Sequence, residues 1–238
     1  VCKDFNIRET NGEAWLTFDQ LNNQEKFDIE ELKPRYGIGG VDLASTTDLT
    51  AATVIFMLPN DDKIYVEQMY WLPEDLLEKR VVEDRVPYDQ WKDLGLLRTT
   101  PGNKVHYKFV VDWFVEMQNE KDIYIPWIGY DSWSATYFVE EMKNYFGEQA
   151  MEPVIQGKKT LSSPMKSLGA DLESKRIVYN NNPILKWNLT NVAVDVDKNN
   201  NIQPMKTNNQ KKRIDGFASL LDAYVVLERR MEDYMNII

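Results

Sequence analysis

Short apolar runs separated by turn residues dominate the chain from residue 36 onward. Residues 36–45 form an apolar run opened by three glycines, residues 50–56 are β-prone, and residues 63–71 follow a strong turn signal at 59–62. Runs of this kind, bounded by turn residues, are typical of strands. The pattern predicts three strands in an antiparallel meander.

Helical and strand patterns alternate after residue 106. The predicted helices cover residues 107–120, 134–146 and 163–176, and the predicted strands cover residues 123–130 and 153–156. Pro164 suits the first turn of the third of these helices. A nearly continuous apolar run such as 123–130 is typical of a strand buried on both faces.

Three further segments complete the pattern. Residues 74–106 have the character of an insertion, helix-prone at first and then a predicted hairpin at 96–106. Residues 192–196 and 202–205 are predicted to pair with each other, and residues 214–231 predict a long helix that packs against the sheet. Together these elements predict a mixed α/β sheet, with three antiparallel strands and then parallel strands, flanked by helices.

The composition is that of a globular protein. Hydrophobic residues make up 43% of the 238-residue chain, which is enough to bury a substantial core. No window approaches the length of an apolar membrane span, and the single cysteine, Cys2, excludes an internal disulfide or a cysteine metal cluster. We therefore expect a soluble, cytoplasmic protein. Residues 1–35 are polar, acidic and weakly patterned, so we expect a connecting segment outside the core.

Charge is distributed unevenly along the chain. The formal net charge is −10, but residues 158–213 contain eleven basic and four acidic side chains, so this segment carries +7 and the remainder −17. Such a segment is a candidate surface for phosphate groups, and an ordinary solvated surface is the alternative. The candidate phosphate contacts are Lys158, Lys159, Lys211, Lys212 and Arg213.

Three aspartates stand at the boundaries of predicted elements. Asp42 lies within an apolar strand, Asp131 ends another strand, and Asp215 begins the last helix. If the first two strands are neighbours, their carboxylates lie roughly 5 Å apart, a span that suits two divalent ions. Carboxylate oxygens favour Mg²⁺ or Mn²⁺ over zinc. The alternative role for Asp131 and Asp215 is helix capping.

Two more aspartates are candidates for an outer part of this site. Asp48 follows Asp42 by six residues in a turn, where an aspartate is also common for structural reasons. Asp222 follows Asp215 by seven residues, on the same helical face but about 10 Å along the axis. Both are therefore metal-ligand candidates of lower rank than the other three.

Three segments of the sequence carry a family resemblance. GIGGVDLASTTDLTAATVIF from Gly37, IGYDSW from Ile128 and KKRIDGFASLLDAY from Lys211 resemble the nuclease domain of tailed-phage terminase large subunits. The resemblance implies a ribonuclease-H-like fold for residues 36–238 and an endonuclease that cuts concatemeric double-stranded phage DNA during genome packaging. It implies two metal ions, Mg²⁺ or Mn²⁺, held by Asp42, Asp131 and Asp215.

The resemblance also implies partners and a setting. Family members carry an N-terminal packaging ATPase and work with the terminase small subunit and the portal protein in the host cytoplasm. No phosphate-binding loop of the G-x-x-x-x-G-K-[ST] type occurs in this chain, so residues 1–35 are expected to be the remnant of a linker from a missing ATPase domain. Gly216 stands where the family pattern has a proline, which leaves the ligand Asp215 intact.

Three alternatives remain open at this stage. An actin-like or sugar-kinase-like ATP-binding fold also places an aspartate before small residues and a threonine pair, but Leu43 to Ser45 offers no glycine for close approach to phosphate. A transposase or resolvase nuclease would share the same fold. An interaction module would keep the fold and only dock onto packaging proteins. The one histidine, His106, is expected to have a surface or packing role.

Overall fold

A central mixed sheet organises the computed structural model, which describes residues 14–44, 49–132, 136–206 and 212–238. Within these ranges the sheet has seven strands in the order β4-β3-β2-β1-β5-β6, with β7 pairing to β3. The strands are β1 Tyr36–Asp42, β2 Thr50–Phe56, β3 Ile64–Pro73, β4 Leu97–Thr100, β5 Tyr124–Asp131, β6 Met151–Val154 and β7 Ile177–Val178. The predicted mixed α/β sheet is confirmed.

The pairing within the sheet follows the predicted order. β1 pairs with β2 and β2 with β3 in antiparallel fashion, so the meander is confirmed. β1 pairs with β5 in parallel, and β5 with β6 likewise. Because β1 and β3 are each antiparallel to β2, the strands β1, β3 and β5 all end at the same edge of the sheet.

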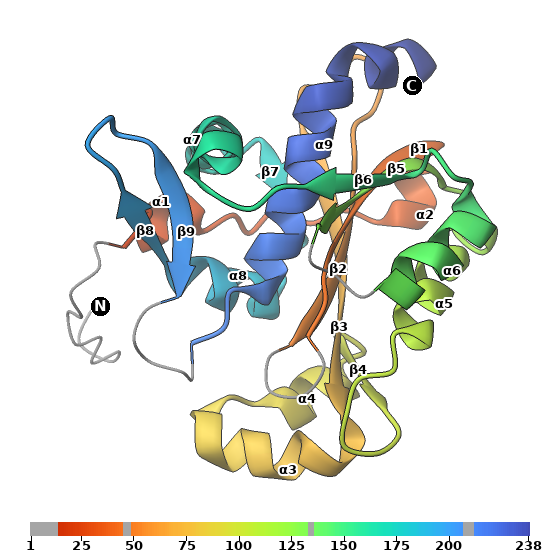
Figure 1. The fold of residues 1–238 in the computed structure, drawn as a ribbon, viewed down its shortest axis with the longest axis vertical. Helices are drawn as coiled ribbons and strands as arrows, with labels where there is room; N and C mark the ends of the chain where they lie inside the picture. Colours follow the sequence, from red (N-terminus) through yellow and green to blue (C-terminus); the bar gives the residue numbers. More distant parts are fainter. Residues whose placement is uncertain (1–13, 45–48, 133–135, 207–211) are drawn as a thin grey trace.

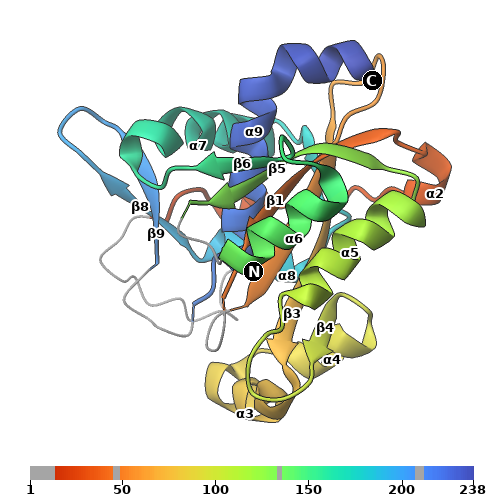
Figure 2. The ribbon, with the colours of Figure 1, turned by 45° about the vertical axis from the view of Figure 1, so that its right-hand side comes forward.

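Helices cover both faces of the sheet. They are α1 Phe18–Leu21, α2 Ile29–Leu32, α3 Leu77–Arg80, α4 Tyr88–Asp93, α5 Lys108–Asn119, α6 Thr136–Phe146, α7 Lys158–Glu173, α8 Pro183–Thr190 and α9 Asp215–Ile237. The helix α9 crosses one face, while α5 and α6 cover the other (Figures 1 and 2). One apolar core lies between the sheet and α7, α8 and α9, and a second lies under α5 and α6. No helix among the described residues is long and apolar enough to cross a bilayer.

A helical insertion joins β3 to β4. It consists of the 3-10 turn η1 Glu74–Leu76, then α3, the π-helical turn η2 Val81–Arg85, and α4. It lies at the edge of the sheet where β3 ends, at the bottom of Figure 1. The predicted helical character of this segment is confirmed, and Pro87 separates η2 from α4.

The predicted hairpin at 96–106 is wrong. The segment contributes one strand, β4, which pairs in parallel with β3. After β4, the Thr100 hydroxyl donates to the Lys104 carbonyl at 3.0 Å. This local side-chain hydrogen bond takes the place of the backbone pairing that a second strand would have provided. The hairpin of β8 Val192–Val196 and β9 Ile202–Lys206 is confirmed and forms a separate two-stranded sheet.

The predicted start of the helix at 163–176 is also wrong. The helix α7 begins at Lys158, after Gly157 with φ +134°, and Pro164 lies inside it. A proline in a helix removes one backbone donor and crowds the preceding turn. Here Pro164 is buried in the domain, so its packing compensates for the lost helix hydrogen bond. The local sequence pattern does not reveal this packing.

The described part of the N-terminal segment packs onto the domain. Trp15 donates its backbone N–H to Val192 at 3.1 Å, and its ring lies 5.0 Å from that of Phe217. Leu21 is buried in the core between the sheet and α9. The prediction that this segment lies outside the core is therefore wrong for these residues. Its role as a linker to a further domain stays a prediction.

Candidate active site

Asp42 and Asp131 lie at the ends of neighbouring parallel strands. The register of β1 and β5 pairs Val41 with Tyr130, so the next residue on each strand is an aspartate. Adjacent strands lie about 4.8 Å apart, which places the two carboxylates side by side. Both residues are half-buried.

The position of Asp42 differs from the prediction that it lies within its strand. It is the last residue of β1. Immediately afterwards the Thr50 hydroxyl bonds to both the amide and the carbonyl of Ala44, at 3.1 and 2.7 Å. These side-chain bonds replace strand pairing, so the chain leaves the sheet and Asp42 stands at its edge.

Two glycines show which face the two aspartates share. A Cβ atom on Gly40 would lie 2.1 Å from the Ser219 carbonyl oxygen, and one on Gly129 would lie 2.4 Å from that of Asp222. Both glycines therefore face α9 at close range. Side chains alternate along a strand, so Asp42 and Asp131, two positions farther along β1 and β5, lie on the same face.

The helix α9 carries the other two acids. Asp215 at its start is 2% exposed and Asp222 is 4% exposed. Burial raises the pKa of Asp222 well above its usual range; the hydrogen bond from Gln156 Nε2 at 3.2 Å opposes this, and the charge of Asp131 adds to it. Burial and the charge of Asp215 likewise raise the pKa of the Tyr70 hydroxyl. The charge of Asp131 therefore acts on Asp222, and the charge of Asp215 acts on Tyr70.

The four described acids share one face of the sheet without forming a closed cluster. Within the described residues, no three acidic, histidine or cysteine side chains converge as metal ligands. The donors are nonetheless hard carboxylate oxygens, the chemistry that Mg²⁺ and Mn²⁺ prefer. The donor set thus fits a divalent cation held first by the strand-end pair. Asp48 lies outside the described residues.

The predicted basic residues are in different environments. Lys158 pairs with Asp195 at 2.8 Å, Lys159 is exposed and Lys212 is half-buried, whereas Lys211 lies outside the described residues. Arg213 is 5% exposed and pairs with Asp84 at 3.3 Å. Because its guanidinium is buried in an ion pair, direct phosphate contact by Arg213 is not compatible with this structure.

A hollow next to Asp42 was not predicted from the sequence. It measures about 430 Å³ and is lined by Lys104, Val105, His106, Tyr107, Lys108 and Tyr137. Burial and the charge of Asp42 raise the pKa of Tyr107, so one residue of the hollow lies within electrostatic reach of Asp42. The cluster of His106, Tyr107 and Lys108, close after Lys104, is the sequence signal that could have found it.

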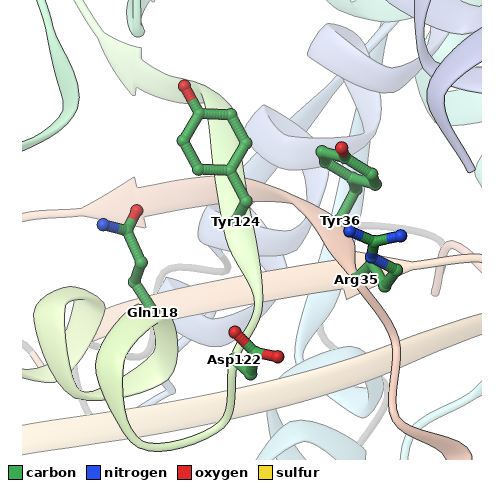
Figure 3. Close-up of a pocket in the computed structure, with 5 residues that line it drawn as sticks. All are labelled: Arg35, Tyr36, Gln118, Asp122 and Tyr124. Carbon is green, nitrogen blue, oxygen red and sulfur yellow. The ribbon is translucent and has the colours of Figure 1, made fainter.

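A second hollow lies at the other end of the same strands. It measures about 420 Å³ and is lined by Arg35, Tyr36, Gln118, Asp122 and Tyr124 (Figure 3). Tyr36 and Tyr124 are the first residues of β1 and β5. Strands of seven and eight residues span roughly 20 Å, so this hollow is separate from the acidic edge.

Comparison with solved structures defines the class of the fold. The chain matches the large terminase nuclease of thermophilic phage G20c, solved with bound magnesium, with a TM-score of 0.53 and 12% identity, covering 91% of this chain and 98% of that one. It matches the g2p nuclease domain of bacteriophage SPP1, solved with bound Mn, with a TM-score of 0.52 and 16% identity, covering 88% and 95%. The fold is therefore that of a ribonuclease-H-like terminase nuclease domain.

Sequence comparison then identifies the family. The model of the terminase large subunit, endonuclease domain, matches residues 1–231, and the chain belongs to this family. The large terminase subunit of Enterobacteria phage HK97 is 30% identical over 188 residues, which is 79% of this chain and 36% of that protein. Its crystal structure matches with a TM-score of 0.71 and 28% identity, covering 83% of this chain and 42% of that one. This chain thus spans less than half the length of that relative.

Membership in this family decides between the predicted classes. The resemblance predicted from the three sequence segments is confirmed, and the chain belongs to the endonuclease-domain family of terminase large subunits. The actin-like ATP-binding and transposase alternatives are therefore set aside. The interaction-module alternative concerns activity rather than family, and only an activity measurement separates it.

Proposed function

We propose that this chain is a divalent-metal-dependent endonuclease that cuts concatemeric double-stranded phage DNA with little sequence specificity during genome packaging. One observation carries the proposal: Asp42 and Asp131 end neighbouring parallel strands on the sheet face that α9 covers. That helix brings Asp215 to the same face. Three acids from distant parts of the sequence therefore belong to one face of the sheet, which supports a shared role.

The proposed metal ligands are Asp42, Asp131 and Asp215, with Asp48 and Asp222 as outer candidates. The bound magnesium of the G20c domain and the bound Mn of the SPP1 domain support Mg²⁺ or Mn²⁺. Two such ions, when bound, lower the pKa of the attacking water and stabilise the leaving oxygen. The three side chains hold negative charge at the edge, and β1 and β5 fix the spacing of two of them.

Phosphate contacts are proposed for the exposed basic residues near this edge. Lys159 is exposed and Lys212 is half-buried, so both can present an ammonium group to a DNA backbone. Lys158 would first have to leave Asp195. Contacts to phosphate position DNA without reading its sequence. Cutting with little sequence preference follows from this kind of contact.

The wider setting is part of the same proposal. The chain spans 36% of the HK97 protein, so we assign the packaging ATPase to a further domain of a longer protein, joined through residues 1–35. The terminase small subunit and the portal protein are the proposed partners, in the cytoplasm of the host.

A plasmid assay tests the proposed activity. Supercoiled DNA is incubated with the wild type in Mg²⁺, Mn²⁺ or chelator, and nicked and linear products are quantified. We expect cleavage with metal, none with chelator, and loss of cleavage in Asp42→Asn. Asp112→Asn is the matched control, because Asp112 is an exposed aspartate on α5 that pairs with Lys108 one turn away on the same helix.

Three outcomes would overturn the proposal. Cleavage that survives the chelator would contradict metal dependence. Equal cleavage by the wild type and Asp42→Asn would remove the site. If a folded wild type shows no cleavage with either metal, the chain acts as an interaction module instead.

A further inference from the structure

The backbone on either side of Asp215 is held by buried polar side chains from distant elements. We call these four residues the α9 anchor: Gln68, Asp84, Asn188 and Asn191. Asn188 is fully buried, Gln68 is 4% exposed and Asn191 is 6% exposed, while the Asp84 side chain is 4% exposed. They come from β3, the helical insertion, α8 and the residue after α8.

The anchor binds both flanks of Asp215. On one side, the guanidinium of Arg213 pairs with Asp84 at 3.3 Å. The backbone carbonyl of Arg213 accepts a hydrogen bond from Asn191 Nδ2 at 3.0 Å. On the other side, the Gly216 N–H donates to Asn188 Oδ1 at 2.9 Å, and the Gly216 carbonyl accepts from Gln68 Nε2 at 2.8 Å. Four contacts thus fix a segment of four residues.

The helix needs this support because its own sequence provides no cap. Ile214 occupies the N-cap position and makes no side-chain cap bond. Helix starts leave backbone N–H groups without partners, and a side-chain oxygen usually satisfies one of them. Asn188, which is 28 residues away in the sequence, supplies that oxygen to Gly216.

Gly216 permits this close approach. A Cβ atom at this position would lie 2.3 Å from the Tyr70 hydroxyl oxygen. Tyr70 is fully buried and donates its hydroxyl hydrogen to Gln68 Oε1 at 2.5 Å, so it has no room to move away. The glycine at this position therefore lets the start of α9 lie directly on β3.

Asp84 extends the anchor into the helical insertion. It lies in the π-helical turn η2, and it accepts a hydrogen bond from the Tyr88 hydroxyl at 3.0 Å in addition to its pair with Arg213. A buried carboxylate with an arginine and a tyrosine is a rigid, charge-assisted contact. The insertion is thereby linked to a residue two positions before Asp215.

We propose that Asp84 and Asn188 are positioning residues for Asp215, which they hold through Arg213 and Gly216 in the orientation needed to share a divalent cation with the strand-end acids. This inference rests on the proposed function. Residues that orient a metal ligand typically change metal affinity or activity by roughly 10–100-fold when they are removed. The insertion between β3 and β4 thus acts as a support of the metal site.

The molecule contains a matched control for Asp84. Asp171 on α7 is also a buried aspartate that accepts from an arginine and a tyrosine: Arg176 Nη1 at 2.6 Å and the Tyr224 hydroxyl at 2.6 Å. Asp84 differs in having a second arginine nearby, Arg80, whose Nη1 lies 3.9 Å from Asp84 Oδ1. It fastens the middle of α9 to α7, away from Asp215. Asp84→Asn and Asp171→Asn therefore make the same chemical change at the start and in the middle of one helix.

The first test measures metal binding without relying on cleavage. The wild type and both variants are titrated with Mn²⁺, and the rise in Tm gives a midpoint concentration for each; plasmid cleavage is measured over the same titration. We expect Asp84→Asn to raise both midpoints by at least about tenfold. Asp171→Asn should lower the metal-free Tm and leave both midpoints unchanged.

A second pair of variants guards against misfolding of Asp84→Asn. Asn188→Ala removes the oxygen that caps α9, and Asn182→Ala removes the oxygen that caps α8 through Ile184 and Leu185. We expect only Asn188→Ala to raise the Mn²⁺ midpoint. Equal midpoints in both members of either folded pair would overturn the positioning role. A wild type with neither a Tm shift nor cleavage would instead refute the proposed function itself.

Discussion

The two halves of the candidate active site are positioned in different ways. Asp42 and Asp131 are half-buried at the ends of β1 and β5, and the pairing of these two strands sets their spacing. Asp215 and Asp222 are buried on α9, whose place depends on close contact with strand glycines and on the α9 anchor. The first half depends on backbone register, and the second depends on side chains.

This difference has a consequence for how the halves respond to change. A backbone ladder spreads its energy over many hydrogen bonds, so a substitution at a strand end leaves it intact. Buried polar contacts are costly to disturb because each one leaves a group without its partner. We therefore expect substitutions in the strand half to change chemistry alone, and substitutions in the helix half to change chemistry and stability together.

The largest expected effect comes from removing one acid of each half. Asp131→Asn and Asp215→Asn should both lower plasmid cleavage in Mn²⁺ by more than the roughly 100-fold expected for a residue that only orients a ligand. The metal-free Tm should stay near that of the wild type for Asp131→Asn and change for Asp215→Asn, because only Asp215 is buried. If Asp215→Asn cleaves DNA as fast as the wild type, Asp215 is not part of the site, and the site consists of the strand acids alone.

The next effect concerns the contact that brings the halves together. Gly129→Ala places a Cβ atom against the Asp222 carbonyl, so it should destabilise the protein by about 3 kcal/mol, at the upper end of overpacking effects. Urea unfolding measures this. Gly169→Ala in α7 is the control, because its Cβ atom would meet the Trp15 ring at 3.2 Å rather than backbone. Equal decreases in the free energy of unfolding in both variants would contradict the close backbone contact between α9 and β5.

A pH effect arises outside both halves and must be separated from them. Burial raises the pKa of Glu67 to about 7, against a small opposing effect of the Lys121 charge. Glu67 neighbours Gln68, which faces α9, so it lies on the opposite face of β3. Between about pH 4.5 and 7 the unfolded chain loses this proton while the folded protein keeps it.

The sign of this effect follows directly. The pKa of Glu67 is higher in the folded protein than in the unfolded chain. Its contribution to the free energy of unfolding is therefore fully present below about pH 4.5, and up to about 3 kcal/mol is lost as the pH rises through 7. Glu67→Gln should remove this loss, so the variant gains on the wild type between pH 5 and pH 8 in urea unfolding. A difference between the two proteins that does not change with pH would refute this assignment.

The smallest effect tests one hydrogen bond of the helix half. The hydroxyls of Thr53 and Ser219 lie 2.7 Å apart between β2 and α9. Ser219→Ala should cost about 1 kcal/mol in urea unfolding, since Thr53 keeps its bond from Gln68 Nε2 at 2.7 Å. Cleavage at saturating Mn²⁺ should be unchanged. A large loss of cleavage would mean that this bond, rather than the anchor, orients α9.

Much of the fold was predictable because it depends on local patterns. The meander, the strand β5 and the helix α9 each follow from hydrophobic spacing within one segment. The prediction that β5 is buried on both faces is wrong, because five of its eight residues are half-buried or exposed. The same spacing placed Asp42 and Asp131 at strands that could be neighbours. Their pairing itself needed the sheet order, which no local pattern contains.

Most of the errors share one cause. Pro164 inside α7 and the buried Leu21 depend on packing partners far away in the sequence. The hairpin expected at 96–106 failed for a local reason, the hydrogen bond from the Thr100 hydroxyl to the Lys104 carbonyl. Arg213 was predicted to contact phosphate because it stands in a basic run, yet Asp84, more than a hundred residues earlier, holds it inside the protein. A run of basic residues in the sequence does not show which of their side chains are exposed, because exposure depends on tertiary packing.

The sequence by itself determined the family, the order of the main elements and the strand-end acids, because hydrophobic spacing and short motifs are encoded within single segments. Only the tertiary structure decided which face the acids share, how α9 is held and which charges remain accessible. Those properties arise from contacts such as Asn188 with Gly216, between residues that are distant along the chain and close only after folding.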